Sequence, residues 1–176
     1  LNNVSSDFVD VEVFYGPVGP MNTLEESHTI KMKLEGKLED VLKNGSFTFL
    51  ISGYTGVGKT KLVEQVKEEA REKGFKIFEE KAFPESTRNY FPFQDIFTDI
   101  QHELEVPEDA EKPLMLKSDE LREGGGKSDE GDQNYFDEII FQETTEWLSK
   151  VSEDNPLLIF LDDLQWSKST TYQMLY

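Results

Sequence analysis

A lysine and a threonine that directly follow a glycine-rich segment are the residues whose types and spacing most clearly suggest chemistry. Gly53, Gly58, Lys59 and Thr60 fit the pattern G-x-x-x-x-G-K-[ST] at every fixed position. This spacing suits a phosphate because glycines allow backbone N–H groups to point inward around it. The lysine can then reach the β and γ phosphates, and the hydroxyl can ligate Mg²⁺. The sequence therefore predicts a phosphate site, with Lys59 as a catalytic residue and Thr60 as a metal ligand.

The predicted phosphate contacts cover the whole loop and the start of the helix that follows. They comprise Gly53, Tyr54, Thr55, Gly56, Val57, Gly58, Lys59, Thr60 and Lys61. The alternative is a glycine-rich turn between a strand and a helix that binds no ligand. The composition of the chain predicts only about 0.01 chance matches, and the motif has the flanking strand and helix patterns that it requires. We therefore favour a binding loop.

A second glycine-rich stretch, "GGGKS" at 124–128, imitates the later half of the pattern. Leu121 stands where the first glycine is needed, and no strand or amphipathic helix pattern flanks the stretch. We interpret it as a linker within an acidic insertion at 106–134. This insertion is expected to be disordered because so little apolar surface cannot offset the entropy of ordering the chain.

Two adjacent acids end an apolar run, "LLIFLDD", at 157–163. A carboxylate at the end of a strand suits Mg²⁺ bound to phosphates, so Asp162 is assigned to the metal. Asp163 is placed to orient or deprotonate a water that attacks the γ phosphate, and it is the second predicted catalytic residue. The alternative is that an acid only caps the next helix, for which Ser167 is also a candidate N-cap.

Apolar residues recur with strand and helix periodicity around these two motifs. Strands are predicted at 46–52, 75–83 and 157–163, and helices at 30–42, 59–73, 93–104 and 136–151. This alternation predicts an α/β fold with a parallel sheet, whose ligands bind beyond the carboxyl ends of the strands. Both motifs fall at such an end. Residues 1–22 are expected to form a short extended segment and a turn that lead into a domain over 23–176.

Charge and composition narrow the classes of function. The chain has 18 basic and 36 acidic residues, a net charge of −18, and no cysteine. Nonspecific nucleic-acid binding needs clustered Lys and Arg, which this chain lacks, so no direct nucleic-acid contact is expected. A thiolate metal site and a cysteine nucleophile are excluded. No apolar run is long enough to span a membrane, so the expected location is cytoplasmic.

Three segments resemble one known family, the AAA-type ATPase domains related to origin-recognition ATPases and found in STAND signalling ATPases of the MalT type. "GYTGVGKTKLVEQV" resembles the Walker A segment, "YFPFQDIF" an aromatic and proline-containing segment, and "NPLLIFLDDLQWSKSTTYQML" the Walker B segment. The resemblance implies a P-loop NTPase fold, a three-layer α/β sandwich with a mostly parallel sheet. It also implies that the chain stops after the Walker B strand and is a piece of a longer protein.

The sequence departs from the family pattern at two places. Pro17 stands where the family has an arginine, and Asp163 where classical AAA proteins have the longer glutamate. Trp166, which follows the acids, is interpreted as a buried aromatic rather than a ligand contact. The family also has a strand between the Walker A and Walker B strands. Strands 46–52 and 157–163 are therefore expected to lie about 10 Å apart, two strand spacings.

The resemblance implies an ATP-binding, Mg²⁺-dependent regulatory ATPase domain of a larger multidomain signalling protein. ATP and Mg²⁺ are the expected cofactors, and effector domains of the same polypeptide, such as kinase or cyclase modules, are the expected partners. A nucleotide-dependent oligomer is compatible with the family. Two alternatives stay open at this point, a nonhydrolysing nucleotide-binding switch and a P-loop phosphotransferase that acts on a small molecule.

Overall fold

The computed structural model describes residues 10–15, 24–43, 46–53, 55–56, 58–86, 88–104, 106, 113–117 and 130–175. These residues belong to two compact units, and the boundary between the units falls between Lys76 and Ile77. No helix in these ranges combines the length and the apolar character needed to cross a membrane. Each unit contributes one pair of strands, β1 with β2 and β3 with β4.

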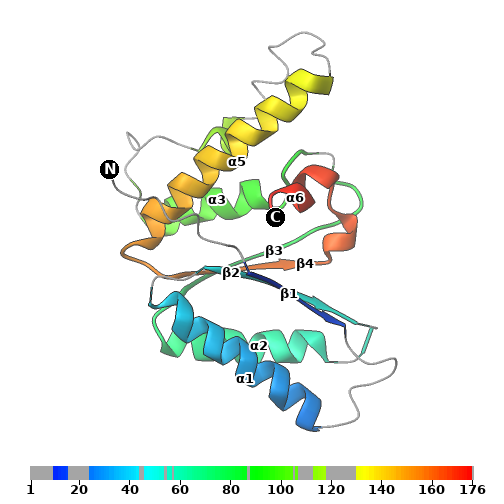
Figure 1. Cartoon of the computed structure of the whole chain (residues 1–176), viewed down its shortest axis with the longest axis vertical. Coiled ribbons are helices and arrows are strands. Elements are labelled where there is room, and N and C mark those ends of the chain that lie inside the picture. Colours follow the sequence, from blue (N-terminus) through cyan, green and yellow to red (C-terminus); the bar gives the residue numbers. More distant parts are fainter. Residues whose placement is uncertain are drawn as a thin grey trace. The chain divides into compact units, whose positions relative to one another are not determined.

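The first unit pairs two parallel strands and two helices. Strand β1 (Asp10–Tyr15) runs parallel to β2 (Phe47–Ser52), with Asp10 opposite Phe47 and Tyr15 opposite Ser52. The extended piece predicted within residues 1–22 is therefore a strand of the sheet. Helices α1 (Leu24–Val41) and α2 (Lys59–Glu72) lie side by side (Figure 1). Both bury apolar residues spaced four apart, namely Leu34 and Leu38, and Leu62, Val66 and Ala70.

Helix α2 ends at the glycine that the sequence predicts as its stop. Gly74 has a φ of 87°, a left-handed conformation that glycine adopts without steric cost. The N–H of Phe75 donates to the carbonyl of Ala70, and that of Gly74 donates to Arg71, both at 3.0 Å. This pair of bonds is a Schellman motif, and it turns the chain from α2 toward β3 (Lys76–Lys81).

The second unit is built on an aromatic core between two helices. Helices α3 (Phe93–Glu103) and α5 (Glu130–Ser152) lie side by side (Figure 1), and the rings of Phe97 and Trp147 meet edge to face at 5.7 Å. The strand β4 (Leu157–Asp162) pairs with β3. The buried members of this core are Phe78, Tyr90, Phe93, Ile96, Phe97, Ile100, Met115, Ile140 and Trp147.

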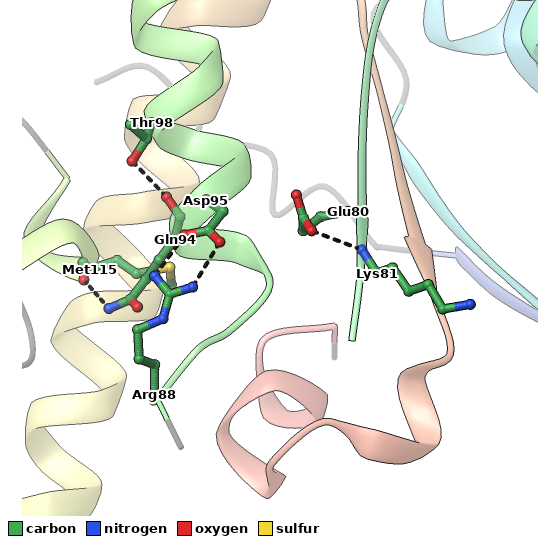
Figure 2. A network of polar contacts seen from close by, with 7 residues as sticks. All are labelled: Glu80, Lys81, Arg88, Gln94, Asp95, Thr98 and Met115. Atoms are coloured by element: carbon green, nitrogen blue, oxygen red, sulfur yellow. Dashed lines mark hydrogen bonds and ion pairs between the residues drawn. The ribbon is translucent and has the colours of Figure 1, made fainter. Parts of the chain in front are cut away.

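The region predicted as a disordered insertion contains an ordered turn. The 3₁₀ helix η1 (Leu114–Lys117) contacts α3 and α5, and Met115 is fully buried. The side-chain amide of Gln94 donates to the carbonyl of Met115 at 3.1 Å (Figure 2). The structure differs from the sequence expectation here because three consecutive apolar residues can reach the core despite their acidic surroundings. Helix α5 also begins at Glu130, inside the predicted insertion, while 124–128 lies outside the described residues.

Short elements follow β4 and lead to the end of the described chain. The 3₁₀ helix η2 (Leu164–Trp166) comes directly after the acid pair, and α6 (Ser169–Gln173) follows it. Every predicted strand and helix has a counterpart, with ends that differ by a few residues, except that α1 and α5 begin six residues earlier than predicted. The three-layer sandwich and the spacing of β2 from β4 concern both units together and stay predictions.

Candidate functional site

The loop between β2 and α2 has the backbone that a phosphate cradle needs. Gly56 has a φ of 86° and Gly58 a φ of 100°, conformations that side chains rarely adopt. A Cβ atom built on either glycine would meet no heavy atom within 4 Å apart from those of its chain neighbours, which are left aside, so only the backbone conformation disfavours a side chain at these positions. Tyr54 and Val57, both predicted to contact phosphate, lie outside the described residues.

The start of α2 lacks a capping side chain. Gly58 is the N-cap residue and makes no side-chain hydrogen bond, and the first turn holds no acidic residue. The first N–H groups of a helix have no partner within the helix, and the aligned peptide dipoles place positive potential there. This helix end therefore fits an anion such as a phosphate.

Lys59 reaches back across the loop that precedes it. Its ammonium donates to the carbonyl of Gly53 at 2.7 Å, which joins the start of α2 to the end of β2. The lysine side chain is half-buried, whereas Thr60 and Lys61 are exposed. The structure thus brings together Gly53 and Lys59, two of the residues predicted to contact phosphate.

The acid pair sits on a sharp turn at the end of β4. Asp162 is the last residue of the strand, and its carboxylate accepts the N–H of Asp163 at 2.9 Å. Asp163 has a φ of 53°, which is uncommon for residues other than glycine but is tolerated by aspartate. Its carbonyl accepts the N–H of Trp166 at 3.0 Å. Both carboxylates reach solvent, with side-chain exposures of 62% for Asp162 and 35% for Asp163.

A family model described as AAA ATPase domain matches residues 32–176. The match includes the glycine loop, the aromatic and proline-containing segment, and the acid pair. This chain belongs to the AAA ATPase domain family. Its fold is therefore a P-loop α/β fold, and its family is one of nucleotide-binding ATPase domains. No curated protein and no solved structure matches the chain.

The oxygen donors of this AAA domain fit a magnesium–nucleotide complex. Mg²⁺ takes one or two carboxylates together with substrate phosphates and retains several waters, so it needs no all-protein cage. The hydroxyl of Thr60 and the carboxylate of Asp162 are hard oxygen ligands of this kind, and both residues are exposed. Within the described ranges, no group of three or more His, Asp or Glu side chains forms a metal cluster. Thr60 belongs to the first unit and Asp162 to the second, so their meeting at one ion stays a prediction.

Lys81 is the residue beside the acid pair that sequence reasoning missed. It ends β3, and its ammonium lies 2.7 Å from Oδ2 of Asp163 and 3.7 Å from Oδ2 of Asp162. The hydrogen bond to Asp163, with the charges of both aspartates, raises the pKa of Lys81 above its usual value. A signal was available, because two neighbouring strands of a parallel sheet bring their carboxyl ends together. Had the strands 75–83 and 157–163 been taken as neighbours, the last residues of "FKIFEEK" and "LLIFLDD" would have been expected to meet.

The capping alternative for the acids is wrong. Asp163 occupies the N-cap position of η2, but its side chain makes no capping hydrogen bond, and the N-cap of α6 is Lys168 rather than an acid. Ser167 is not that N-cap either, and its hydroxyl is buried without a hydrogen-bond partner in the part of the chain that the structure describes. The carboxylate of Asp163 instead bonds to the side chains of Lys81 and Gln165.

The interpretation of Trp166 as a buried aromatic is also wrong. The residue is 50% exposed, because it ends a three-residue turn of which no member is buried. The other tryptophan of the AAA domain, Trp147, fills the core at 7% exposure. Their burial differs because Trp147 lies on the inner face of a long helix, whereas Trp166 lies on the short turn that follows the carboxyl end of β4.

The aromatic and proline-containing segment is bonded to the helix that follows the acid pair. The hydroxyl of Thr171 donates to the carbonyl of Phe91 at 2.6 Å, and the N–H of Tyr90 donates to the hydroxyl of Thr170 at 3.4 Å. Tyr90 is fully buried, and its hydroxyl donates to Asp137 on α5. Two of the three segments that resemble the family are therefore in direct contact within the second unit.

Proposed function

We propose that this AAA domain binds ATP with Mg²⁺ and hydrolyses it slowly as the regulatory module of a larger signalling protein, of the STAND type related to origin-recognition ATPases. The observation that supports the proposal best is the loop between β2 and α2. Two of its glycines, Gly56 and Gly58, hold left-handed conformations, its helix end has no capping side chain, and Lys59 donates a hydrogen bond back to Gly53. These are the properties of a phosphate cradle.

Residues Gly53–Lys61 would hold the phosphates through backbone N–H groups. Lys59 would exchange its neutral carbonyl partner, Gly53, for phosphate oxygens, which accept stronger charge-assisted hydrogen bonds. Thr60 and Asp162 would hold the metal. Mg²⁺, when bound, neutralises charge on the β and γ phosphates. Asp163 would orient the attacking water at the γ phosphate.

One observation favours the nonhydrolysing switch as a second candidate. Both oxygens of the Asp163 carboxylate are already engaged, one by the Lys81 ammonium and one by the Gln165 amide. A cation so close stabilises the charged carboxylate and weakens it as a base. Asp163 would then orient a water better than it would deprotonate one, and turnover would be slow. No described residue favours the phosphotransferase.

The remaining parts of the proposal concern the whole protein. Kinase or cyclase modules of the same polypeptide would be the partners, with ATP and ADP as ligands and a cytoplasmic location. A nucleotide-dependent oligomer belongs to the same proposal. The resemblance of "LLIFLDDLQW" to the STAND Walker B segment supports it, and the net charge of −18 argues against nucleic acid as a direct partner.

ATP binding by the full chain, measured by calorimetry, tests the proposal. Lys59→Ala should weaken binding about 10-fold or more, since a hydrogen bond to a charged group contributes about 1.5–3 kcal/mol. The matched control is Lys150→Ala, which removes the same charge from an exposed position on α5 and should leave the affinity unchanged. Equal ATP affinity in all three proteins would overturn the proposed site.

A further inference from the structure

We propose that Lys81 is a positioning residue of the acid pair: it holds the Asp163 carboxylate in place and competes with the divalent cation at Asp162. The family match assigns Lys81 no role, and the glycine-loop and acid motifs do not include it. The inference deepens the proposed function and rests on it, because it concerns how the acid pair receives a magnesium–nucleotide complex.

The first support is that two elements hold Asp163. Its Oδ2 lies 2.7 Å from the ammonium of Lys81 at the end of β3, and its Oδ1 accepts a bond of 3.1 Å from Gln165 on η2. A carboxylate that is bound at both oxygens keeps a single orientation, and catalytic groups need such fixed geometry. The Gln165 contact comes from the turn that directly follows the acids, whereas the Lys81 contact comes from another strand.

The second support is that backbone bonds fix the place of Lys81. The N–H of Ala82, the residue after Lys81, donates to the carbonyl of Asp162 at 3.0 Å. This bond sets the register of the two strand ends, so the lysine must emerge beside the acids. Figure 2 shows the Lys81 side chain extended toward the end of β4 and away from Glu80, whose carboxylate accepts the backbone N–H of Lys81.

The third support is the balance of charge. Two adjacent carboxylates and one ammonium leave a single net negative charge at the turn, and the ammonium is 3.7 Å from the carboxylate that is assigned to the metal. Mg²⁺ is repelled by this ammonium. Removing it should tighten Mg²⁺ binding about 3- to 10-fold, the range expected for exposed charges in water with salt screening.

If Lys81 only stabilised the fold, Lys81→Met would lower the thermal unfolding midpoint, and we do not expect this. Lys81 is 61% exposed, and exposed ion pairs contribute little to stability. Lys81→Met should therefore leave the thermal unfolding midpoint almost unchanged while it alters the site. Lys76→Met is the matched control, because it removes the same charge from the first residue of the same strand.

The experiment measures the Mg²⁺ concentration that gives half-maximal ATP binding by the full chain. We expect Lys81→Met to lower it about 3- to 10-fold, and Lys81→Arg and Lys76→Met to match the wild type. ATP binding in EDTA should stay within about twofold of the wild type in all of them, since the phosphate loop is intact. Turnover should fall in Lys81→Met and recover in Lys81→Arg. An unchanged Mg²⁺ requirement, or an equal shift in Lys76→Met, would overturn the proposal.

A second readout separates this inference from the proposed function. Trp166 is exposed and bonded to the backbone of Asp163, so its fluorescence should report Mg²⁺ at the turn, in a Trp147→Phe background. Titration with Mg²⁺ alone should show the same shift for Lys81→Met. If no protein bound ATP, the proposed function would fail, and this titration would still decide the role of Lys81. Identical Mg²⁺ titrations of wild type and Lys81→Met would overturn that role.

Discussion

The glycine loop and the acid pair are held in place in different ways. The loop is shaped by its own residues, with two glycines in left-handed conformations and a lysine that bonds to a carbonyl six residues earlier. The acid pair is held partly by its own turn and partly by a residue distant in sequence, because Lys81 lies on another strand. The turn is also joined through α6 to the segment that contains Phe91. A short motif therefore names the residues of a local site, whereas it does not name a residue that reaches the site from another strand.

Substitution of Asp163, the proposed catalytic acid, should have the largest effect, because it should separate ATP binding by the glycine loop from turnover at the acid pair. We expect Asp163→Asn to preserve ATP affinity, because the loop supplies the phosphate contacts, and to lower turnover about 10²–10⁴-fold, the usual contribution of a positioned acid or base. Paired binding and steady-state ATPase measurements on the full chain check this. Full turnover in Asp163→Asn would leave Asp163 without a catalytic role.

Removing the contact between α6 and the aromatic segment should have the next largest effect, which is on the free energy of unfolding. Thr171→Val removes the hydroxyl that donates to Phe91 and leaves a buried carbonyl without that partner, which costs about 1–3 kcal/mol. Chemical denaturation of the purified chain measures the loss in free energy of unfolding.

Thr144→Val is the matched control for this substitution. The hydroxyl of Thr144 is buried on α5 and has no hydrogen-bond partner within the described ranges, so its removal should be neutral or stabilising. Equal destabilisation by both substitutions would show that the bond to Phe91 adds nothing beyond packing.

Because the loop is shaped by its own residues, we expect a glycine substitution there to reduce stability less than Thr171→Val does. Gly58→Ala places a side chain at a φ of 100°, and left-handed conformations cost a non-glycine residue about 1–2 kcal/mol. Gly36→Ala is the matched control, because a Cβ atom at either glycine meets nothing within 4 Å and only Gly58 has a positive φ. Gly36 lies within α1, so alanine there should stabilise by about 0.8–1 kcal/mol. Unfolding measurements that gave both variants the same sign would contradict the strain argument.

The same contrast explains how far the sequence could predict the structure. β2, α2 and its end at Gly74 were predictable because apolar periodicity, glycine and lysine act within a few residues. The exposure of Trp166 and the burial of Met115 were not, because each depends on what a distant segment does or does not bring beside it. The 3₁₀ turn at η1 shows this most clearly, since its three apolar residues gain a partner only once α3 and α5 pack together.

The smallest predicted effect concerns a long-range ion pair in the first unit. Lys73 contacts Glu69 on α2 at 3.2 Å and Glu39 on α1 at 3.4 Å, and the hydrogen bond to Glu69 is the main cause that raises its pKa above 10.5. A raised pKa in the folded state means that the protonated lysine stabilises the fold below its ordinary pKa. This contribution disappears as the pH rises through the higher folded value.

Lys73→Met should therefore lower the thermal unfolding midpoint slightly at neutral pH, and its difference from the wild type should decline above pH 10.5 as the pH rises through the higher folded pKa. Lys150→Met, on α5, is the control and should show no such pH-dependent difference. The effect is expected to be small because the pair reaches solvent and salt screens it. A large loss of the unfolding midpoint at neutral pH would instead mean that the first unit, like the second, depends on contacts between distant segments. The two sites would then differ only in their sequence motifs.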